Sequence, residues 1–209
     1  MDEGPSAHRG HRGRPEREVR SNKQVGDTTY TYTTLSGKVM RQQWGEKSLE
    51  FVYDDGNQPF AVIYNDGSTS TLYYYVLNAQ GDVAAILNSS GKLAASYDYD
   101  AWGNCTVYDS SDAAIGDLNP LRYRSYYYDA ETGFYYLQSR YYDPAICRFI
   151  NADGLFTDGF IGANLFAYCA NNPVNTVDPT GNFAITATVA LITFGVALVA
   201  TALAVGISS

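Results

Sequence analysis

Apolar and polar positions alternate in short stretches between about residue 27 and residue 109. Runs of Tyr, Val, Thr and Ile are separated by turn sequences such as Asp55-Gly56-Asn57. A period of two residues indicates strands, and Asn-Gly or Asp-Gly pairs between such runs favour tight hairpins. The pattern therefore predicts antiparallel strands that include residues 30–33, 49–53, 60–64, 71–76 and 95–99.

Glycines punctuate these strands at nearly regular intervals. Consecutive members of the set are 10 to 14 residues apart: Gly56, Gly67, Gly81, Gly91 and Gly103. A βαβ pattern would need longer helical segments between strands. The spacing instead predicts a repeated series of hairpins.

The second half of the chain is less regular. Residues 110–119 are predicted to be a polar loop, and residues 121–128 and 134–142 to form one long, tyrosine-rich hairpin. Asp143-Pro144 ends it, because proline cannot donate to a central ladder. The segment 145–181 is expected to be a loop-rich plug, with a short helix near residues 164–170.

The last segment, 183–207, contains 25 residues and no charge. As a helix it would be about 37 Å long, enough to cross a hydrocarbon core of about 30 Å. We expect a transmembrane or membrane-inserting helix, with a helix enclosed by protein as the alternative. No Lys or Arg follows Arg148, so the positive-inside rule cannot orient it.

Composition supports a mainly β fold, because 19 of the 209 residues are Tyr and 19 are Gly. Residues 1–26 are predicted to be a disordered, basic tail, since they have almost no apolar residues to bury. They lack the apolar stretch of a secretory signal, so no N-terminal signal peptide is expected in this chain. With the apolar C-terminal segment, we expect a membrane-associated, cell-surface or secreted protein.

The residue inventory excludes several kinds of chemistry. A net charge of −8 argues against nucleic acid as a partner. The only histidines, His8 and His11, lie in the tail, which excludes histidine-based catalysis and zinc sites in the body. Neither a metal nor a cofactor is expected. The three cysteines, Cys105, Cys147 and Cys169, are expected to be small buried residues. A single Cys147–Cys169 disulfide bridge is left open as the alternative.

Five motifs carry a resemblance to a known family. They are YDYDAWGN at 97–104, NPLRYR at 119–124, DAETGFYYLQSRYYDP at 129–144, RFINAD at 148–153 and NLFAYCANNPVNTVDPTG at 164–181. Residues 73–181 resemble the RHS repeat-associated core domain of YD-repeat shell proteins, which include bacterial polymorphic toxins and wall-associated proteins. Residues 27–72 resemble the end of a degenerate YD-repeat array.

The resemblance implies a β-ribbon that winds into a hollow shell, a core domain that plugs it, and a C-terminal effector held behind the D-P-x-G motif. A shell of this kind needs more strand repeats than this sequence offers, so we expect a fragment or truncated member. The implied partners are an upstream repeat shell, the effector and an immunity protein. If segment 183–207 inserts into a membrane, the membrane is a further partner.

Self-cleavage near the D-P-x-G motif is also implied by the family. The matching positions are Asp153 and Asp178 as an aspartyl pair, with Arg148 orienting or neutralising charge. The segment Asp178-Pro179-Thr180-Gly181 is equally a good turn sequence, which needs no catalysis.

Three functions follow from these observations. The first is a structural, non-catalytic core or plug module that encapsulates or displays the C-terminal segment. The second is an autoproteolytic aspartyl-type module that releases the segment after Gly181. The third is a cell-surface carbohydrate-binding protein, which would need an open face of tyrosine rings.

Overall fold

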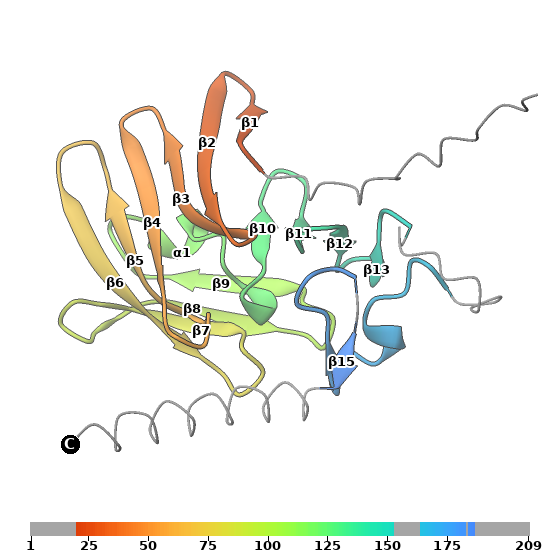
Figure 1. The fold of residues 1–209 in the computed structure, drawn as a ribbon. Coiled ribbons are helices and arrows are strands. Elements are labelled where there is room, and N and C mark those ends of the chain that lie inside the picture. The colour runs from red at the N-terminus through yellow and green to blue at the C-terminus, as the bar shows by residue number, and fades with distance from the viewer. Residues whose placement is uncertain (1–19, 153–163, 183, 187–209) are drawn as a thin grey trace, which may run out of the picture.

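The computed structural model describes residues 20–152, 164–182 and 184–186 (Figure 1). These residues form three antiparallel sheets, with one short α-helix and two 3₁₀ turns between them. The predicted mainly β fold is confirmed.

The largest sheet has nine strands, and each strand pairs with its neighbours in sequence. The five predicted runs lie within strands of this sheet. The boundary expected between the repeat array (27–72) and the core domain (73–181) lies inside β6, so the large sheet continues across it. The strands are β1 (Asn22–Val25), β2 (Thr28–Leu35), β3 (Lys38–Trp44), β4 (Lys47–Tyr53), β5 (Pro59–Asn65), β6 (Ser70–Leu77), β7 (Val83–Asn88), β8 (Leu93–Tyr99) and β9 (Cys105–Asp109).

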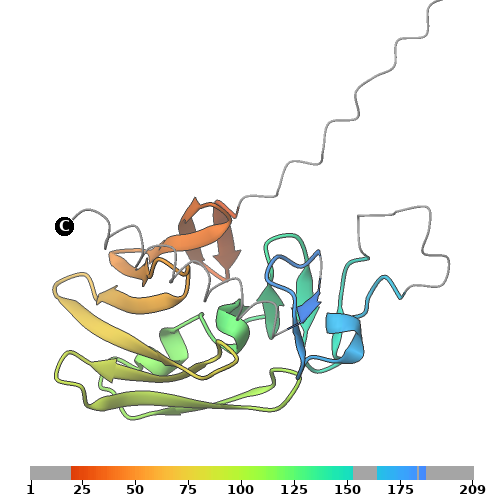
Figure 2. The same ribbon diagram turned by 60° about the horizontal axis from the view of Figure 1, so that its bottom comes forward.

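This sheet curves around the helix α1 (Ile115–Leu118), which lies on its concave side (Figure 2). Irregularities in register, such as those at Thr33/Thr34 and Val76/Leu77, increase the local twist of the strands. Ile115 is fully buried against the sheet, and Tyr97 Oη donates to the Gly116 carbonyl at 2.8 Å. The segment 110–119, predicted to be a polar loop, therefore contains a short helix whose Ile115 packs against the concave face of the sheet.

Four of the connections are the same turn. In each, the first residue donates its N–H to the carbonyl of the fifth and accepts from the N–H of the fourth. The side-chain oxygen of the first residue also accepts the N–H of the fifth, at 2.8 to 3.0 Å. Four of the five glycine-marked turns predicted from the spacing are thus of one type and start at Asp54, Asn78, Asn88 and Asp100. The turn at Gly67 differs, because the Asp66 N–H donates to the Thr69 carbonyl.

The predicted hairpin over 121–142 is wrong as a single long element. A 3₁₀ turn at Tyr123–Ser125 interrupts its first strand, and Gln138, with a φ of 67°, turns its second. Buried Arg124 and Arg140 draw the backbone out of the ladder, because each guanidinium bonds carbonyls elsewhere in the chain. The result is a four-stranded sheet of β10 (Tyr127–Asp129), β11 (Phe134–Tyr136), β12 (Tyr141–Asp143) and β13 (Arg148–Phe149).

The third sheet is a pair of two-residue strands, β14 (Thr176–Val177) and β15 (Ile185–Thr186), which follows a 3₁₀ turn at Cys169–Asn171. That turn replaces the helix predicted near residues 164–170. The predicted helix over 183–207 is wrong at residues 185–186, because these β-branched residues pair with the edge of β14. Residues 183 and 187–207 lie outside the described part of the chain.

Within residues 20–152, 164–182 and 184–186, the structure has no helix of the length and apolar character that a bilayer crossing requires.

The predicted tail over 1–26 is wrong for its last residues, since residues 22–25 form β1 and pair with β2. The long-range partners of this strand could not be predicted from local sequence. Arg20 and Lys23 both form ion pairs with Asp129, more than a hundred residues later in the chain. Residues 1–19 lie outside the described part.

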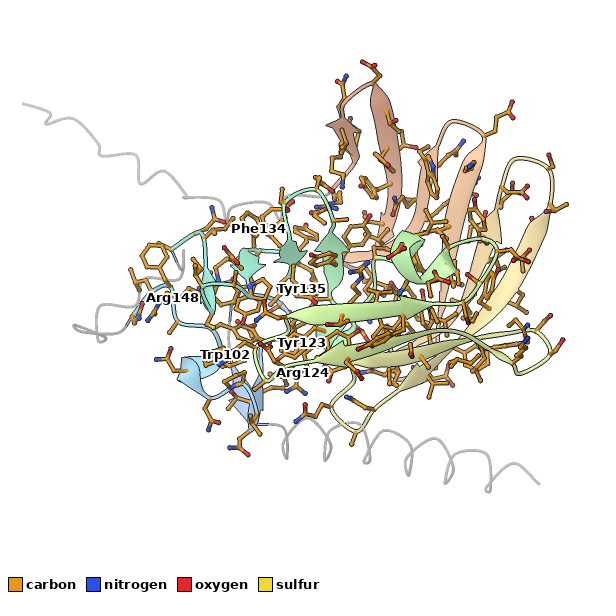
Figure 3. All side chains as sticks on the ribbon, turned by 180° about the vertical axis from the view of Figure 1, so that it is seen from behind. Trp102, Tyr123, Arg124, Phe134, Tyr135 and Arg148 are labelled. Carbon is orange, nitrogen blue, oxygen red and sulfur yellow. The ribbon has the colours of Figure 1, made fainter. Side chains whose placement is uncertain are left out.

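Tyrosine hydroxyls join the small sheet to the last of the repeated turns. Tyr123, Tyr142 and Tyr135 donate to the successive carbonyls of residues 101, 102 and 103, at 2.9, 2.7 and 2.8 Å. Figure 3 shows Tyr123 and Tyr135 side by side between the two sheets, with ring centroids 5.9 Å apart. The YDYDAWGN motif is therefore the surface on which the small sheet is positioned.

Candidate functional site

The C-terminal D-P-T-G segment lies against Tyr126 and the turn between β11 and β12, in a polar cluster that is buried except for Ser139. We call this cluster the exit site and define it as Tyr126, Ser139, Arg140, Asp178 and Gly181. Arg140 lies in the turn between β11 and β12, where the Leu137 N–H donates to the Arg140 carbonyl at 2.9 Å. This turn directs its side chain inward, and the guanidinium carbon lies 3.6 Å from the centre of the Phe149 ring.

Arg140 and Asp178 form an ion pair with a separation of 3.4 Å between Nη2 and Oδ2. The side chains are only 7% and 2% exposed. Arg140 also donates through Nε to the Gly181 carbonyl and through Nη1 to the Leu165 carbonyl, the latter at 3.2 Å. One guanidinium thus binds a carboxylate and two backbone carbonyls, which suits its planar set of donors.

Asp178 begins a turn that resembles those in the large sheet. Its Oδ1 accepts the N–H of Asn182 at 3.1 Å, as Oδ1 of Asp100 accepts the N–H of Asn104. Gly181 has a φ of 73°, and a Cβ there would lie 2.8 Å from Ser139 Oγ and 2.9 Å from the Leu137 carbonyl. The turn predicted for D-P-T-G is present, and the close approach requires glycine.

Two further hydroxyls bind the backbone of this segment. Tyr126 Oη donates to the Asp178 carbonyl at 2.8 Å, and Ser139 Oγ donates to the Thr180 carbonyl at 2.6 Å. Burial raises the pKa of Tyr126 well above its ordinary value, so it remains a donor at neutral pH. Together with Arg140, these groups bind the carbonyls of residues 178, 180 and 181.

Arg124 provides a second attachment for the C-terminal segment. Its guanidinium donates to the Pro173 carbonyl at 2.6 Å and to the Gln80 carbonyl at 2.8 Å. The backbone N–H of Arg124 donates to Oδ1 of Asp82, which lies in one of the repeated turns. Residues of the N-N-P motif are therefore held against the connection between β6 and β7.

The structure places Asp178 and Arg148, two of the three residues predicted for self-cleavage, in separate parts of the fold. Asp178 is buried in the exit site. Arg148 lies on β13, where it is exposed at the outer side of the small sheet (Figure 3). Asp153 lies outside the described residues. The arginine that bonds Asp178 is Arg140, which the sequence reasoning missed.

The signal for Arg140 was present in the sequence. It stands as one cation within a tyrosine-rich run predicted to pack in the core, and a buried arginine needs anionic or carbonyl partners. Tyr126 and Ser139 gave no comparable signal, because their partners are backbone carbonyls.

Neither the cysteines nor the tyrosine clusters form an open site. The three cysteines are free, and burial raises the pKa of each thiol. Sugar binding would need an open face of tyrosine rings, but many rings in the runs of adjacent tyrosines are buried in the core, among them Tyr73, Tyr75, Tyr126, Tyr127, Tyr135 and Tyr142. These clusters therefore stabilise the fold.

Comparison with known proteins gives consistent matches. A family model described as Teneurin YD-shell matches residues 43–174. The tRNA nuclease WapA of Bacillus subtilis (strain 168) is 40% identical over 162 residues, which cover 72% of this chain and 7% of WapA. The double-stranded DNA deaminase toxin A of Burkholderia cenocepacia is 33% identical over 120 residues, covering 57% of this chain and 8% of that protein. The chain thus spans a small part of these relatives.

Solved structures show the same fold. The crystal structure of TcdB2-TccC3-Cdc42 matches with a TM-score of 0.61 at 24% identity, covering 77% of this chain and 8% of that one. The Photorhabdus luminescens Tc holotoxin pore matches with a TM-score of 0.55 at 23% identity, covering 79% of this chain and 8% of that one.

Proposed function

The chain belongs to the YD-shell (RHS) family, and from that premise we propose that it is a core module that holds a C-terminal effector segment in a fixed place. The wider role is that of a structural shell module of polymorphic toxins. We further propose that the segment is encapsulated or displayed by the shell, at the cell surface or after secretion, with an effector and an immunity protein as partners.

One observation carries this proposal, namely the fixation of the chain at the exit site. Tyr126, Ser139 and Arg140 bind the carbonyls of residues 178, 180 and 181, and the charge-free segment 183–207 begins shortly afterwards. A purely local turn would not need a buried arginine, whose desolvation is costly without good partners. The exit site therefore supports a role in holding the start of the segment.

The convex face of the large sheet offers a second support. Paired positions form a cross-strand row of apolar residues over five strands: Val52, Ala61, Tyr74, Leu87 and Leu93. Val52 and Leu93, at the ends of this row, are 40% and 49% exposed, as is nearby Phe60 at 54%. Ala61 within the row is buried, so the exposed apolar side chains lie at its two ends and at Phe60. Exposed apolar patches mark interaction surfaces, and an apolar segment is a suitable occupant.

The proposal is tested by limited proteolysis of the full chain carrying Arg140→Gln. Loss of the guanidinium leaves Asp178 buried without this cation, so we expect cleavage between residues 176 and 186 to accelerate by about tenfold or more. Arg41→Gln is the control, because Arg41 is 45% exposed and pairs with Glu50 in the large sheet. Equal cleavage rates in wild type and both variants would overturn the proposal, provided that exchange protection of β4–β7 is unchanged.

Self-cleavage is a second candidate, favoured by how the Gly181–Asn182 peptide is held. Arg140 binds its carbonyl oxygen, and Asp178 Oδ1 accepts its N–H at 3.1 Å. A cation at a scissile carbonyl stabilises the charge that develops on oxygen. We propose Asp178, with Asp153 as the second carboxylate and Arg148 as an accessory cation.

Intact mass measurement tests this candidate. We expect a fragment that ends at Gly181 in the wild-type chain and only the full-length chain in Asp178→Asn. An uncleaved wild-type chain would remove self-cleavage and leave the holding role unaffected.

A further inference from the structure

Residues 164–182 lie against the small sheet, and we call them the strap. Figures 1 and 2 show the strap in blue beside the green-to-teal strands β10–β13. The strap follows the body, residues 20–152, through residues 153–163, which lie outside the described part of the chain. The contacts between strap and body can therefore be considered apart from the backbone that connects them.

The body binds the strap at many backbone carbonyls. Those of residues 165, 166, 173, 174, 178, 180 and 181 each accept a hydrogen bond from the body. The donors are the Phe149 N–H and the side chains of Gln80, Arg124, Tyr126, Ser139 and Arg140. Every residue of a peptide has a carbonyl, so these bonds hold the chain without selecting its sequence.

The sequence of the strap matters at a few buried positions. They follow the pattern Y-C-x3-P-x4-D-x2-G and are Tyr168, Cys169, Pro173, Asp178 and Gly181. Side chains between them are exposed, as shown by Val174 at 52%. The body therefore contacts the strap as a binding site contacts a peptide, with a few side chains inserted and the rest in solvent.

Tyr168 is the first anchor of the strap. It is fully buried, and its ring centroid lies 4.0 Å from that of Tyr142 and 5.7 Å from that of Phe149. Beside it, Ala167 forms an antiparallel bridge with Arg148 of β13. A buried aromatic ring next to a strand-like pairing is a recurring way to bind a peptide.

Asp178 is the second anchor. Its carboxylate pairs with Arg140 at 3.4 Å, and between the anchors Arg124 binds the Pro173 carbonyl at 2.6 Å. Both guanidinium groups are donors only, and the strap presents acceptors to them. The body thus fits a peptide that carries a tyrosine followed by an Asp-x-x-Gly turn.

We propose that the body is a binding site for the strap as a separable peptide, and that the strap stays bound when the backbone is cut within residues 153–163. This inference rests on the holding role proposed above and adds that the holding needs no continuous chain. The ligand class is a peptide whose tyrosine and Asp-x-x-Gly turn occupy the two anchor positions.

Cutting the folded full chain tests the proposal. The recognition sequence of a site-specific protease is inserted within residues 153–163, and the cut halves are passed over a gel-filtration column at decreasing concentration. We expect the halves to elute together at about 1 µM, because the two anchors and the carbonyl contacts remain in place. Separation of the halves at this concentration would overturn the proposal.

Variants of the cut chain show whether the anchors set the affinity. Tyr168→Ala should raise the concentration at which the halves separate by about 100-fold or more. Val174→Ala is the matched control, because its side chain is exposed, and it should change that concentration by less than about threefold. Equal separation of the two variants would contradict the anchoring role of Tyr168.

Synthetic peptides give the same comparison if Tyr168→Ala aggregates. The cut wild-type chain is unfolded in urea and refolded with an excess of a labelled peptide of residues 164–186. We expect the wild-type peptide and its Val174→Ala form to enter the complex equally, and the Tyr168→Ala form to remain free. Entry of none of the three, or equal entry of all three, would contradict the proposal.

The cut chain also separates this inference from the holding role. If the halves separate while Arg140→Gln still accelerates proteolysis of the uncut chain, the holding role stands and the peptide-binding site is excluded. If the halves stay together while Arg140→Gln has no effect, the strap is a bound peptide and the exit site is not what holds it.

Discussion

Asp54, Asn78, Asn88 and Asp100 each decide the path of a turn by accepting backbone N–H groups. A short side chain with an acceptor oxygen can imitate a backbone turn, which explains why Asp and Asn recur at this position. At Asp100, burial alone would raise the pKa, but hydrogen bonds from Asn104, Trp102 and Gly103 lower it below its ordinary value. This carboxylate is therefore a structural acceptor.

Gly91 and Gly103 occupy the same position in two of these turns, which makes them a matched pair. Both have positive φ, but only at Gly103 would a Cβ meet a neighbour, the Tyr123 ring at 2.7 Å. We expect Gly91→Ala to cost about 1 kcal/mol of unfolding free energy from backbone strain. Gly103→Ala should cost about 1–3 kcal/mol more, because the ring must move. Urea unfolding measures both, and equal losses would contradict this account.

Asp129 should make stability depend on acid. Burial would raise the pKa of this carboxyl, but Arg20 and Lys23 lower it below its ordinary value. A lowered pKa adds stability above the unfolded value of about 3.9, and that stability is lost as pH falls through the folded value. We expect the urea midpoint to decrease more between about pH 4 and pH 2 in wild type than in Asp129→Asn. Equal decreases would refute the prediction.

Hydroxyl-to-carbonyl bonds connect the elements of this fold. The turn at 101–103 receives the hydroxyls of Tyr135 and Tyr142 from the small sheet and that of Tyr123 from the preceding 3₁₀ turn. Within the large sheet, Tyr99 Oη donates to the Val83 carbonyl at 2.8 Å. Each ring fills the core while its hydroxyl satisfies a backbone acceptor. Phenylalanine could replace the packing but not the bond.

Tyr135→Phe isolates the contribution of one such bond. The hydroxyl is buried and donates to the Gly103 carbonyl, so its removal leaves that acceptor without this donor. We expect a loss of about 1–3 kcal/mol in the free energy of unfolding. Tyr108→Phe is the control, because Tyr108 is 56% exposed and should change stability by less than about 0.5 kcal/mol. Similar losses in both variants would exclude a specific role for the bond.

The sequence predicted those elements whose information is local. Alternation and turn residues located strands β2, β4, β5, β6 and β8, because side-chain period and turn chemistry are read within a few residues. The strands at 22–25 and 185–186 were missed because their order depends on partners: Asp129 for Arg20 and Lys23, and β14 for Ile185 and Thr186.

The candidate site divides in the same way. Asp178 and the turn at D-P-T-G were readable from the motif, and both lie in the exit site. Arg140 was read as part of a strand, because its partners, the Gly181 and Leu165 carbonyls, become visible only in the folded chain. The alternation of apolar and polar residues that predicts a strand cannot indicate that Arg140 lies in a turn outside the paired strands.

The part of the chain that the structure describes contains two aromatic cores that meet at Tyr99. One lies on the concave face of the large sheet, and the other lies between the small sheet and the C-terminal segment. Tyr99 packs against both cores, with its ring centroid 6.1 Å from that of Tyr123. All buried members of the second core lie at residue 123 or later in the chain, so we expect this core to open without unfolding strands β4–β7.

Tyr168→Ala tests this independence. Tyr168 is fully buried in the second core, with its ring centroid 4.0 Å from that of Tyr142, so the truncation should cost about 3–5 kcal/mol. We expect faster amide exchange in β10–β14 and unchanged exchange in β4–β7. Phe51→Ala, a buried ring of the first core, should show the reverse ranking. Exchange that rises equally in both regions for either variant would mean that the two cores unfold together, and that the exit site cannot open while the large sheet remains intact.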